Sequence, residues 1–110
     1  MKKPILPDNI DPVIHERARL AIVSALAVAS EMSFGDLKDS LELSDGNLSA
    51  HARTLETAGY IKISKTFRGR RPLTTMRLTS KGRKAFDSYL DTLRQVIDRG
   101  SDADDGSGAQ

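Results

Sequence analysis

Three arginines lie within four positions around a glycine, in the stretch FRGRRP from 67 to 72. Arg68, Arg70 and Arg71 each present a planar, permanently charged guanidinium group that matches the geometry of phosphate oxygens. The glycine and the proline of this stretch are typical of a turn, so the three side chains are expected close together at a loop tip. This spacing suits the binding of a polyanion. The competing interpretation is that the arginines only solvate an exposed loop.

The positive charge is concentrated in the middle of the chain. From Gly46 to Lys84 there are ten basic residues and one acid, Glu56, which gives this stretch a formal charge of +9. The first 45 residues carry −3 and the last 26 carry −4, so the net charge of +2 conceals a strong polarisation. A concentrated basic surface of this kind favours a polyanionic partner.

Polar side chains able to contact DNA bases precede the arginine stretch, between 44 and 58. Asn47 and Arg53 carry forked donors of the kind that bind adenine N6/N7 and guanine O6/N7. Ser49 and Ala50 are small, so a helix that carries them can bring its backbone close to a groove floor. Cations and hydroxyls further along the chain can donate to phosphates. The predicted DNA-binding residues are Asn47, Ser49, Ala50, Arg53, Thr54, Lys65, Thr66, Arg68, Arg70 and Arg71.

Two of these side chains have alternative structural roles, and the sequence gives little support for metal, catalytic or cofactor sites. Arg53 could instead pair with Glu56 or Thr57 on the surface of its own helix. His51 lies at the edge of a buried stripe, which favours a packed or hydrogen-bonded histidine over a base-reading one. The chain has no cysteine and its two histidines are far apart, so we expect no disulfide and no metal site. No nucleophile–base pair, phosphate loop or cofactor motif is visible, which predicts neither catalytic residues nor a cofactor.

The first elements are expected to be helices. Asp11 and Pro12 predict a helix from 12 to 30, whose second half, LAIVSALAVA, is apolar on almost all sides. Such a helix is either central in a small bundle or shared with a dimer partner. Ser33 predicts the N-cap of a short second helix, and Ser44 that of a third helix over about 44–58.

The remaining elements are a hairpin and a last helix. Alternating apolar and polar residues predict strands over 60–66 and 73–78, joined by a basic turn over 67–72. A last helix over 80–97, capped by Thr79, carries apolar residues three and four positions apart, which suggests packing against another helix. We therefore expect an N-terminal arm over 1–11, one winged domain over 12–99 and a disordered acidic tail over 100–110.

The order helix, helix, helix, strand, basic wing, strand, helix is mainly α with a small β-hairpin, a winged helix-turn-helix. The residues also resemble the winged helix-turn-helix transcriptional regulators of the MarR and ArsR kind, especially small single-domain members. The matching segments are LSAH (48–51), LETAGYI (55–61), FRGRRP (67–72) and LTSKG (78–82). The resemblance covers roughly residues 12–97. It implies a third helix in the major groove, a wing on the backbone or minor groove, and outer helices that form a dimer.

Two positions depart from the pattern of these regulators. Ala50 stands where relatives often have a basic or larger polar residue, which shifts the predicted base contacts to Asn47, Ser49 and Arg53. Ala52 stands where the ArsR pattern usually has leucine. Without cysteine or clustered histidines, metal sensing of the ArsR type is not carried over.

The sequence thus predicts a dimeric regulator that binds specific double-stranded DNA in the cytoplasm. The alternative is a winged-helix protein–protein module whose basic wing binds an acidic partner. No stretch is long and apolar enough to span a membrane. Whether a small-molecule effector exists is left open. The predicted dimer interface comprises Ile14, Ala18, Ile22, Phe86, Tyr89, Leu93 and Val96.

Overall fold

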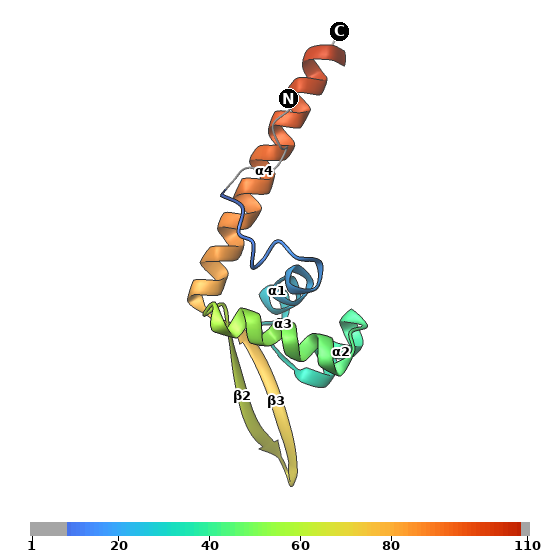
Figure 1. The fold of residues 1–110 in the computed structure, drawn as a ribbon, viewed down its shortest axis with the longest axis vertical. Coiled ribbons are helices and arrows are strands. Elements are labelled where there is room, and N and C mark those ends of the chain that lie inside the picture. Colours follow the sequence, from blue (N-terminus) through green and yellow to red (C-terminus); the bar gives the residue numbers. More distant parts are fainter. Residues whose placement is uncertain (1–8, 109–110) are drawn as a thin grey trace.

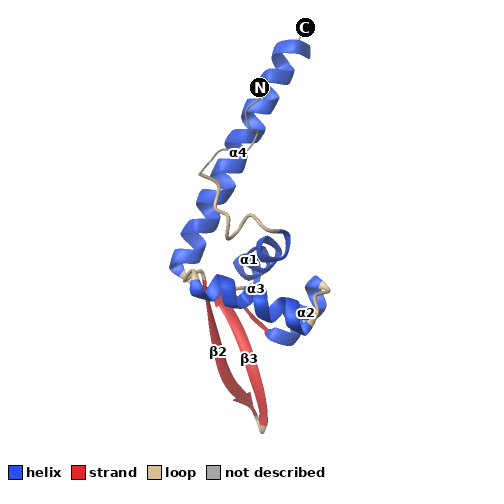
Figure 2. Ribbon diagram, in the orientation of Figure 1, coloured by secondary structure: helices blue, strands red, loops and turns tan. Residues whose placement is uncertain are grey.

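The computed structural model describes residues 9–108, in which three helices cluster around a small sheet and a long fourth helix leads away (Figure 1). The β2–β3 hairpin and α4 project from opposite sides of this cluster (Figure 2). The elements in chain order are α1 (Arg17–Ala29), β1 (Glu31–Ser33), α2 (Phe34–Leu41), α3 (Asp45–Thr57), β2 (Ile61–Arg68), β3 (Arg71–Leu78) and α4 (Ser80–Gly108). The predicted fold class is confirmed.

The helix boundaries follow the predicted capping residues. The hydroxyl of Ser33 accepts the Asp36 N–H at 3.1 Å and caps α2. The hydroxyl of Ser44 accepts the Asn47 N–H, also at 3.1 Å, and caps α3. Each bond satisfies an N–H group that a helix start leaves without a partner. These two caps orient α2 and α3 as a helix-turn-helix.

The hairpin is one part of a three-stranded antiparallel sheet in the order β1-β3-β2. Ile61 pairs with Leu78 at one end of the β2–β3 ladder, and Arg68 pairs with Arg71 at the other. Only two residues remain for the turn, and the first, Gly69, has a φ of +64°. A positive φ at this position is the geometry of a tight two-residue hairpin turn, which glycine adopts without strain.

The core lies between the helices and the near end of the sheet. Its fully buried side chains come from one face each of α1, α2 and α3 and from β2 and β3. They are Ile22, Val23, Leu26, Leu37, Leu48, Ala52, Leu55, Ile61 and Met76. The predicted inward stripe of the third helix, at positions 48, 52 and 55, is therefore confirmed, and its opposite face is left to solvent.

The end of α3 is tied to the start of α4. Thr79 donates its hydroxyl to the Gly59 carbonyl at 2.6 Å and accepts the Gly82 N–H at 2.9 Å, as the predicted cap should. Gly82 packs so tightly that a Cβ there would lie 2.1 Å from the Tyr60 carbonyl oxygen. Only glycine fits this contact, which explains the glycine in the LTSKG segment.

The structure corrects the predicted start of the first helix and adds a strand that was not predicted. The first helix begins at Arg17, not at Pro12, with Glu16 as its N-cap. Asp11 caps a preceding turn instead, where its carboxylate accepts the Val13 N–H at 2.8 Å. The three-residue strand β1 was not predicted, because so short a strand has no periodicity to detect.

The last two elements are longer than predicted. The strands reach Arg68 and Arg71, so most of the expected loop over 67–72 belongs to the sheet. Helix α4 continues to Gly108, whereas the prediction ended it near 97 and made 100–110 disordered. Glycine-rich composition favoured coil there, but no proline interrupts the helical hydrogen bonds. Residues 1–8 of the predicted arm and 109–110 of the tail lie outside the described residues.

Candidate nucleic-acid interface

The outward face of α3 carries all the side chains that were predicted to contact bases. Because positions 48, 52 and 55 point into the core, the residues between them face solvent. We call the outward surface of α3 the reading face. It consists of five exposed residues, Asn47, Ser49, Ala50, Arg53 and Thr54. The Thr54 hydroxyl donates to the Ala50 carbonyl at 3.2 Å, so its hydrogen is engaged within the helix.

Arg53 is positioned to reach outward. Among the ion pairs of the described residues none involves Arg53, so the alternative of a pair with Glu56 is not supported. Its guanidinium group therefore keeps its donors for a partner. On the opposite side of α3, His51 follows the prediction of a hydrogen-bonded rather than a base-reading residue.

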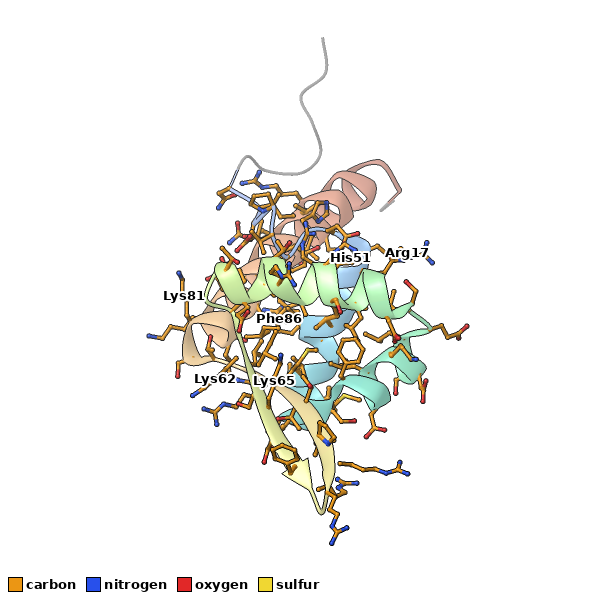
Figure 3. All side chains as sticks on the ribbon, turned by 60° about the horizontal axis from the view of Figure 1, so that its bottom comes forward. Arg17, His51, Lys62, Lys65, Lys81 and Phe86 are labelled. Carbon is orange, nitrogen blue, oxygen red and sulfur yellow. The ribbon has the colours of Figure 1, made fainter. Side chains whose placement is uncertain are left out.

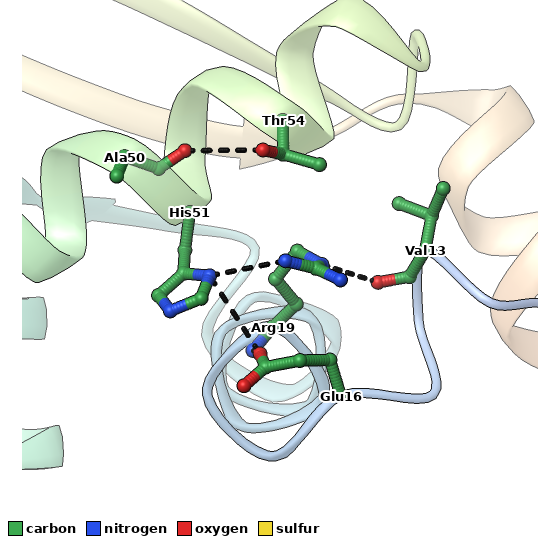
Figure 4. A network of polar contacts seen from close by, with 6 residues as sticks. All are labelled: Val13, Glu16, Arg19, Ala50, His51 and Thr54. Carbon is green, nitrogen blue, oxygen red and sulfur yellow. Dashed lines mark hydrogen bonds and ion pairs between the residues drawn. The ribbon is translucent and has the colours of Figure 1, made fainter.

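His51 joins α3 to the start of α1 (Figure 4). Its Nδ1 lies 3.2 Å from Nη1 of Arg19 and 3.6 Å from the Glu16 carboxylate. Arg19 also donates from Nε to the Val13 carbonyl at 2.6 Å. The N–H of Arg19 bonds the Glu16 carboxylate and, with the nearby His51 and Arg19 side chains, holds its pKa below the ordinary value despite some burial. These contacts fix the orientation of the reading face relative to α1.

The hairpin presents two different faces. Strand residues alternate, so Ile61, Ile63 and Lys65 share the side that meets the core and α3. Lys62, Ser64, Thr66 and Arg68 share the other side, and Figure 3 shows Lys62 and Lys65 on different sides of β2. Arg70 lies in the turn. The predicted wing residues are all exposed but are thus divided between two faces and the tip.

A cavity of about 570 Å³ lies between α3 and the inner face of the hairpin. We call it the notch. Its rim combines the Ser49 and Thr74 hydroxyls with the Arg53 and Lys65 cations, and Glu56 is the one acid among its lining residues. The structure thus brings together three of the predicted DNA-binding residues, Ser49, Arg53 and Lys65. Thr74 was missed, although its cross-strand register with Lys65 places it there.

Only some of the residues predicted for the dimer interface are accessible to a partner in the structure. Ile14, Ile22 and Tyr89 are at most 3% exposed within one protomer, so their assignment to an interface is corrected. Phe86 packs against the core. Ala18 lines a separate groove between α1 and the α2–α3 turn.

The outer half of α4 is the part of the predicted interface that remains available. Leu93 and Val96 there are only half-buried. On the same helix Leu90 is 36% exposed and Ile97 is 64% exposed, large fractions for apolar side chains. This half of α4 therefore presents apolar residues that the protomer does not cover.

A turn over residues 11–15 connects the root of the hairpin to α4. Tyr60 donates its hydroxyl to the Asp11 carboxylate at 2.5 Å, and Nδ1 of His15 lies 2.8 Å from the Tyr89 hydroxyl. The bond to Asp11, followed by burial, raises the pKa of Tyr60 to about 12. Burial also raises the pKa of Tyr89. His15 is thus part of this connection and has no catalytic arrangement around it.

Two other kinds of site are absent from the part of the chain that the structure describes. Residues 9–100, whose side chains the structure describes, hold no cluster of three or more His, Asp or Glu side chains that could bind a metal ion. Over the same residues, no helix combines the length and the apolar character needed to cross a membrane.

Comparison with known proteins places this architecture among DNA-binding domains. Residues 18–97 match a family described as a winged helix DNA-binding domain. An uncharacterized protein of Methanocaldococcus jannaschii is 32% identical over 84 residues, which is 76% of this chain and 91% of that protein. The family match over 18–97 includes both α3 and the hairpin.

Two solved structures show the same fold. A transcriptional regulator homologue from Pyrococcus horikoshii has a TM-score of 0.74 and 31% identity, over 78% of this chain and 85% of that one. A MarR-family transcriptional regulator from Silicibacter pomeroyi has a TM-score of 0.61 and 20% identity, over 79% of this chain and 57% of that one. At 20% identity the second likeness concerns the fold alone.

Proposed function

The chain belongs to the winged helix DNA-binding family of transcriptional regulators, and on that premise we propose that it binds specific double-stranded DNA as a homodimer. In the proposed complex α3 enters the major groove, and the hairpin tip lies on the phosphate backbone or in the minor groove. Transcriptional regulators are not enzymes, and the family assignment agrees with the absence of catalytic motifs in the sequence.

One observation carries the proposal. The ten predicted DNA-binding residues are all exposed: five lie on the reading face of α3, Lys65 lines the notch, Arg70 lies in the turn, and Thr66, Arg68 and Arg71 lie on the other side of the hairpin. The notch is lined by Arg53 and Lys65 together with hydroxyl groups, the donors that phosphate oxygens accept. The Glu56 carboxylate repels a phosphate at one side of the notch. The DNA backbone is therefore expected to lie nearer Lys65 and Thr74.

The two parts of this surface have different roles. Asn47 and Arg53 project from a helix with small neighbours, so they reach base edges and supply sequence preference. Arg68, Arg70 and Arg71 lie at the end of the hairpin, so they neutralise phosphates or enter a narrow minor groove. The proposal therefore separates residues that read the sequence from residues that hold the backbone.

The homodimer is proposed to form mainly through the outer half of α4. Its exposed Leu90 and Ile97 are one heptad apart, and Leu93 and Val96 lie between them. A two-fold axis through this region would present two reading faces to one side of a duplex. The expected site is a pseudo-palindrome with half-sites about one helical turn, roughly 10 base pairs, apart.

Selection of bound duplexes from a random DNA pool tests the function directly. We expect a recovered sequence with two-fold symmetry, bound at least a thousandfold more tightly than random DNA at physiological salt, as specific regulators generally are. Recovery of no common sequence, with a basic wing that captures acidic proteins instead, would support the alternative of a protein–protein module.

A further inference from the structure

The outer face of the hairpin carries a second group of cations. The side chains that face away from α3 on β2 alternate with those in the core, and their cross-strand partners on β3 share that face. Lys62 lies opposite Arg77 near the root, and Arg68 lies opposite Arg71 at the tip. These four exposed side chains form what we call the outer strip.

The outer strip is unfavourable for the fold on its own. Like charges directly opposite each other destabilise an antiparallel sheet, and here two such pairs occupy one face. The acid in register with this face is Glu31 of β1, opposite Arg77. Within the described residues, however, no ion pair joins Glu31 to Arg77. The charge on this face therefore remains available to a partner.

Hydroxyl side chains, which also donate to phosphates, lie between the two cationic pairs on this face. Ser64, Thr66 and Thr75 place hydroxyl groups on the same face. The six steps from Arg71 to Arg77 span roughly 20 Å of strand, since each step rises about 3.3 Å. That length corresponds to about six phosphates of one DNA strand, at 3.4 Å of helix axis each.

We propose that the outer strip binds the phosphate backbone of the DNA that flanks the specific site. This inference rests on the proposed function, because the reading face and notch already occupy the inner side of the hairpin. A hairpin tip in a minor groove has DNA on both sides, so the duplex beyond the tip leaves on the outer side. Lys62 and Arg77, near the root, then attract that flanking segment and extend the contact beyond the groove that the tip enters.

Two duplexes with the same central sequence test the proposal. The short one carries only the selected site of roughly 20 base pairs, and the long one adds about one further turn on each side. The variant is Lys62→Gln with Arg77→Gln, which removes two charges but retains apolar stems. Its matched control is Arg17→Gln with Lys84→Gln, the same charge change at exposed positions that form no ion pair among the described residues and lie outside the outer half of α4.

The wild-type protein should bind the long duplex more tightly than the short one, with a steeper salt dependence. The log–log slope should increase by about 0.9 for each phosphate contact that the flank adds. The Lys62→Gln/Arg77→Gln variant should bind the short duplex like wild type and lose the gain from the flanks, whereas the control keeps it. Thermal melting should show the variant at least as stable as wild type, because a like-charge pair is removed.

Several results would overturn the proposal, and three of them concern the comparison of the two duplexes: no gain from the flanks in wild type, a gain retained by the variant, or an equal loss on both duplexes. The last would assign Lys62 and Arg77 to the specific site itself. Wild-type protein that prefers neither duplex over random DNA would contradict the proposed function instead. Two short duplexes bound at once by one dimer would replace the flank by a second DNA molecule, which also contradicts the proposal.

Discussion

Two parts of the molecule extend away from its core, and they differ in what they expose. The end of the β2–β3 hairpin presents arginines and Lys65, with Phe67, 69% exposed, as its large apolar side chain. The outer half of α4 presents Leu90 and Ile97 on a 29-residue helix that leaves the core on the opposite side (Figure 1). In both parts these side chains stay exposed in the protomer, so packing within the protomer does not explain why arginines occur at one end and apolar residues at the other.

The difference indicates two kinds of partner. Uncompensated cations on a narrow hairpin gain nothing from burial in protein, but they gain from a polyanion through charge and counterion release. Exposed leucine and isoleucine at heptad spacing gain from burial against another apolar helix. The proposed function therefore assigns DNA binding and self-association to opposite ends of the molecule, so that each end can be altered without the other.

The largest effect is expected at the α4 end. Leu90→Glu with Ile97→Glu places charges at two exposed apolar positions, so the folded protomer should be unaffected while a helix–helix interface is disrupted. Light scattering at micromolar concentration should give about 24 kDa for wild type, twice the chain mass. The variant should give the 12.0 kDa of one chain.

Gln95→Glu is the matched control, because it adds a charge at an exposed polar position of the same helix. It should leave the dimer intact. A wild-type mass of 12.0 kDa would remove the dimer from the proposal and the symmetry from the expected DNA site.

At the hairpin end, Arg70→Ala with Arg71→Ala should weaken binding to cognate and random DNA alike. These side chains lie at the tip and are proposed to contact phosphates, so their loss should also reduce the log–log salt slope by about 0.9 for each contact removed. Binding titrations over a salt series measure both quantities. Wild-type affinity and slope on random DNA would show that the tip does not contact DNA, and the protein-module alternative would then gain support.

A smaller and selective loss is expected from the reading face. Arg53→Ala should cost about 1–3 kcal/mol on the selected site and relax the preference at particular base pairs. Repeating the random-pool selection with this variant shows which positions lose preference. A loss of affinity of equal size on every DNA sequence would show that Arg53 contacts phosphates in the notch and not base edges.

Much of this architecture could be predicted from the sequence because local signals agree with it. Ser33, Ser44 and Thr79 are capping residues in front of periodic apolar positions, and each caps the expected helix. The start of α1 was misplaced because Asp11 and Pro12 are equally suited to a turn, and Glu16 provides the actual cap. Strand β1 depends on pairing with β3, which no local pattern of three residues encodes.

The interface was predicted less completely than the fold. Exposure of the reading face follows from helical periodicity, and it could be derived from positions 48, 52 and 55 alone. The division of the wing cations between two faces depends on register, which required strands that reach Arg68 and Arg71. Tyr89 was assigned to a dimer because an apolar stripe alone does not distinguish a partner from the protomer's own turn over residues 11–15, where His15 contacts Tyr89.

The smallest effect is expected where the two ends are joined, at the turn over residues 11–15. Tyr60→Phe removes the hydroxyl that bonds Asp11, and should lower the free energy of unfolding by about 1 kcal/mol at pH 7. Because the bond to Asp11 and burial raise the pKa of Tyr60 to about 12, from 10.0 in the unfolded chain, this stabilisation should be complete below pH 10. It should disappear as the pH rises through 12.

Urea unfolding of wild type and Tyr60→Phe at pH 7 and at successively more alkaline pH measures this difference. Tyr89→Phe serves as a comparison, since it removes the hydroxyl near His15 on the α4 side and leaves the Asp11 contact in place. If the ends are independent, Tyr60→Phe changes stability but leaves both the dimer mass and the affinity for the selected duplex unchanged. A loss of binding free energy larger than the loss of unfolding free energy would instead show that the turn couples α4 to the hairpin. The two ends would then not be independent.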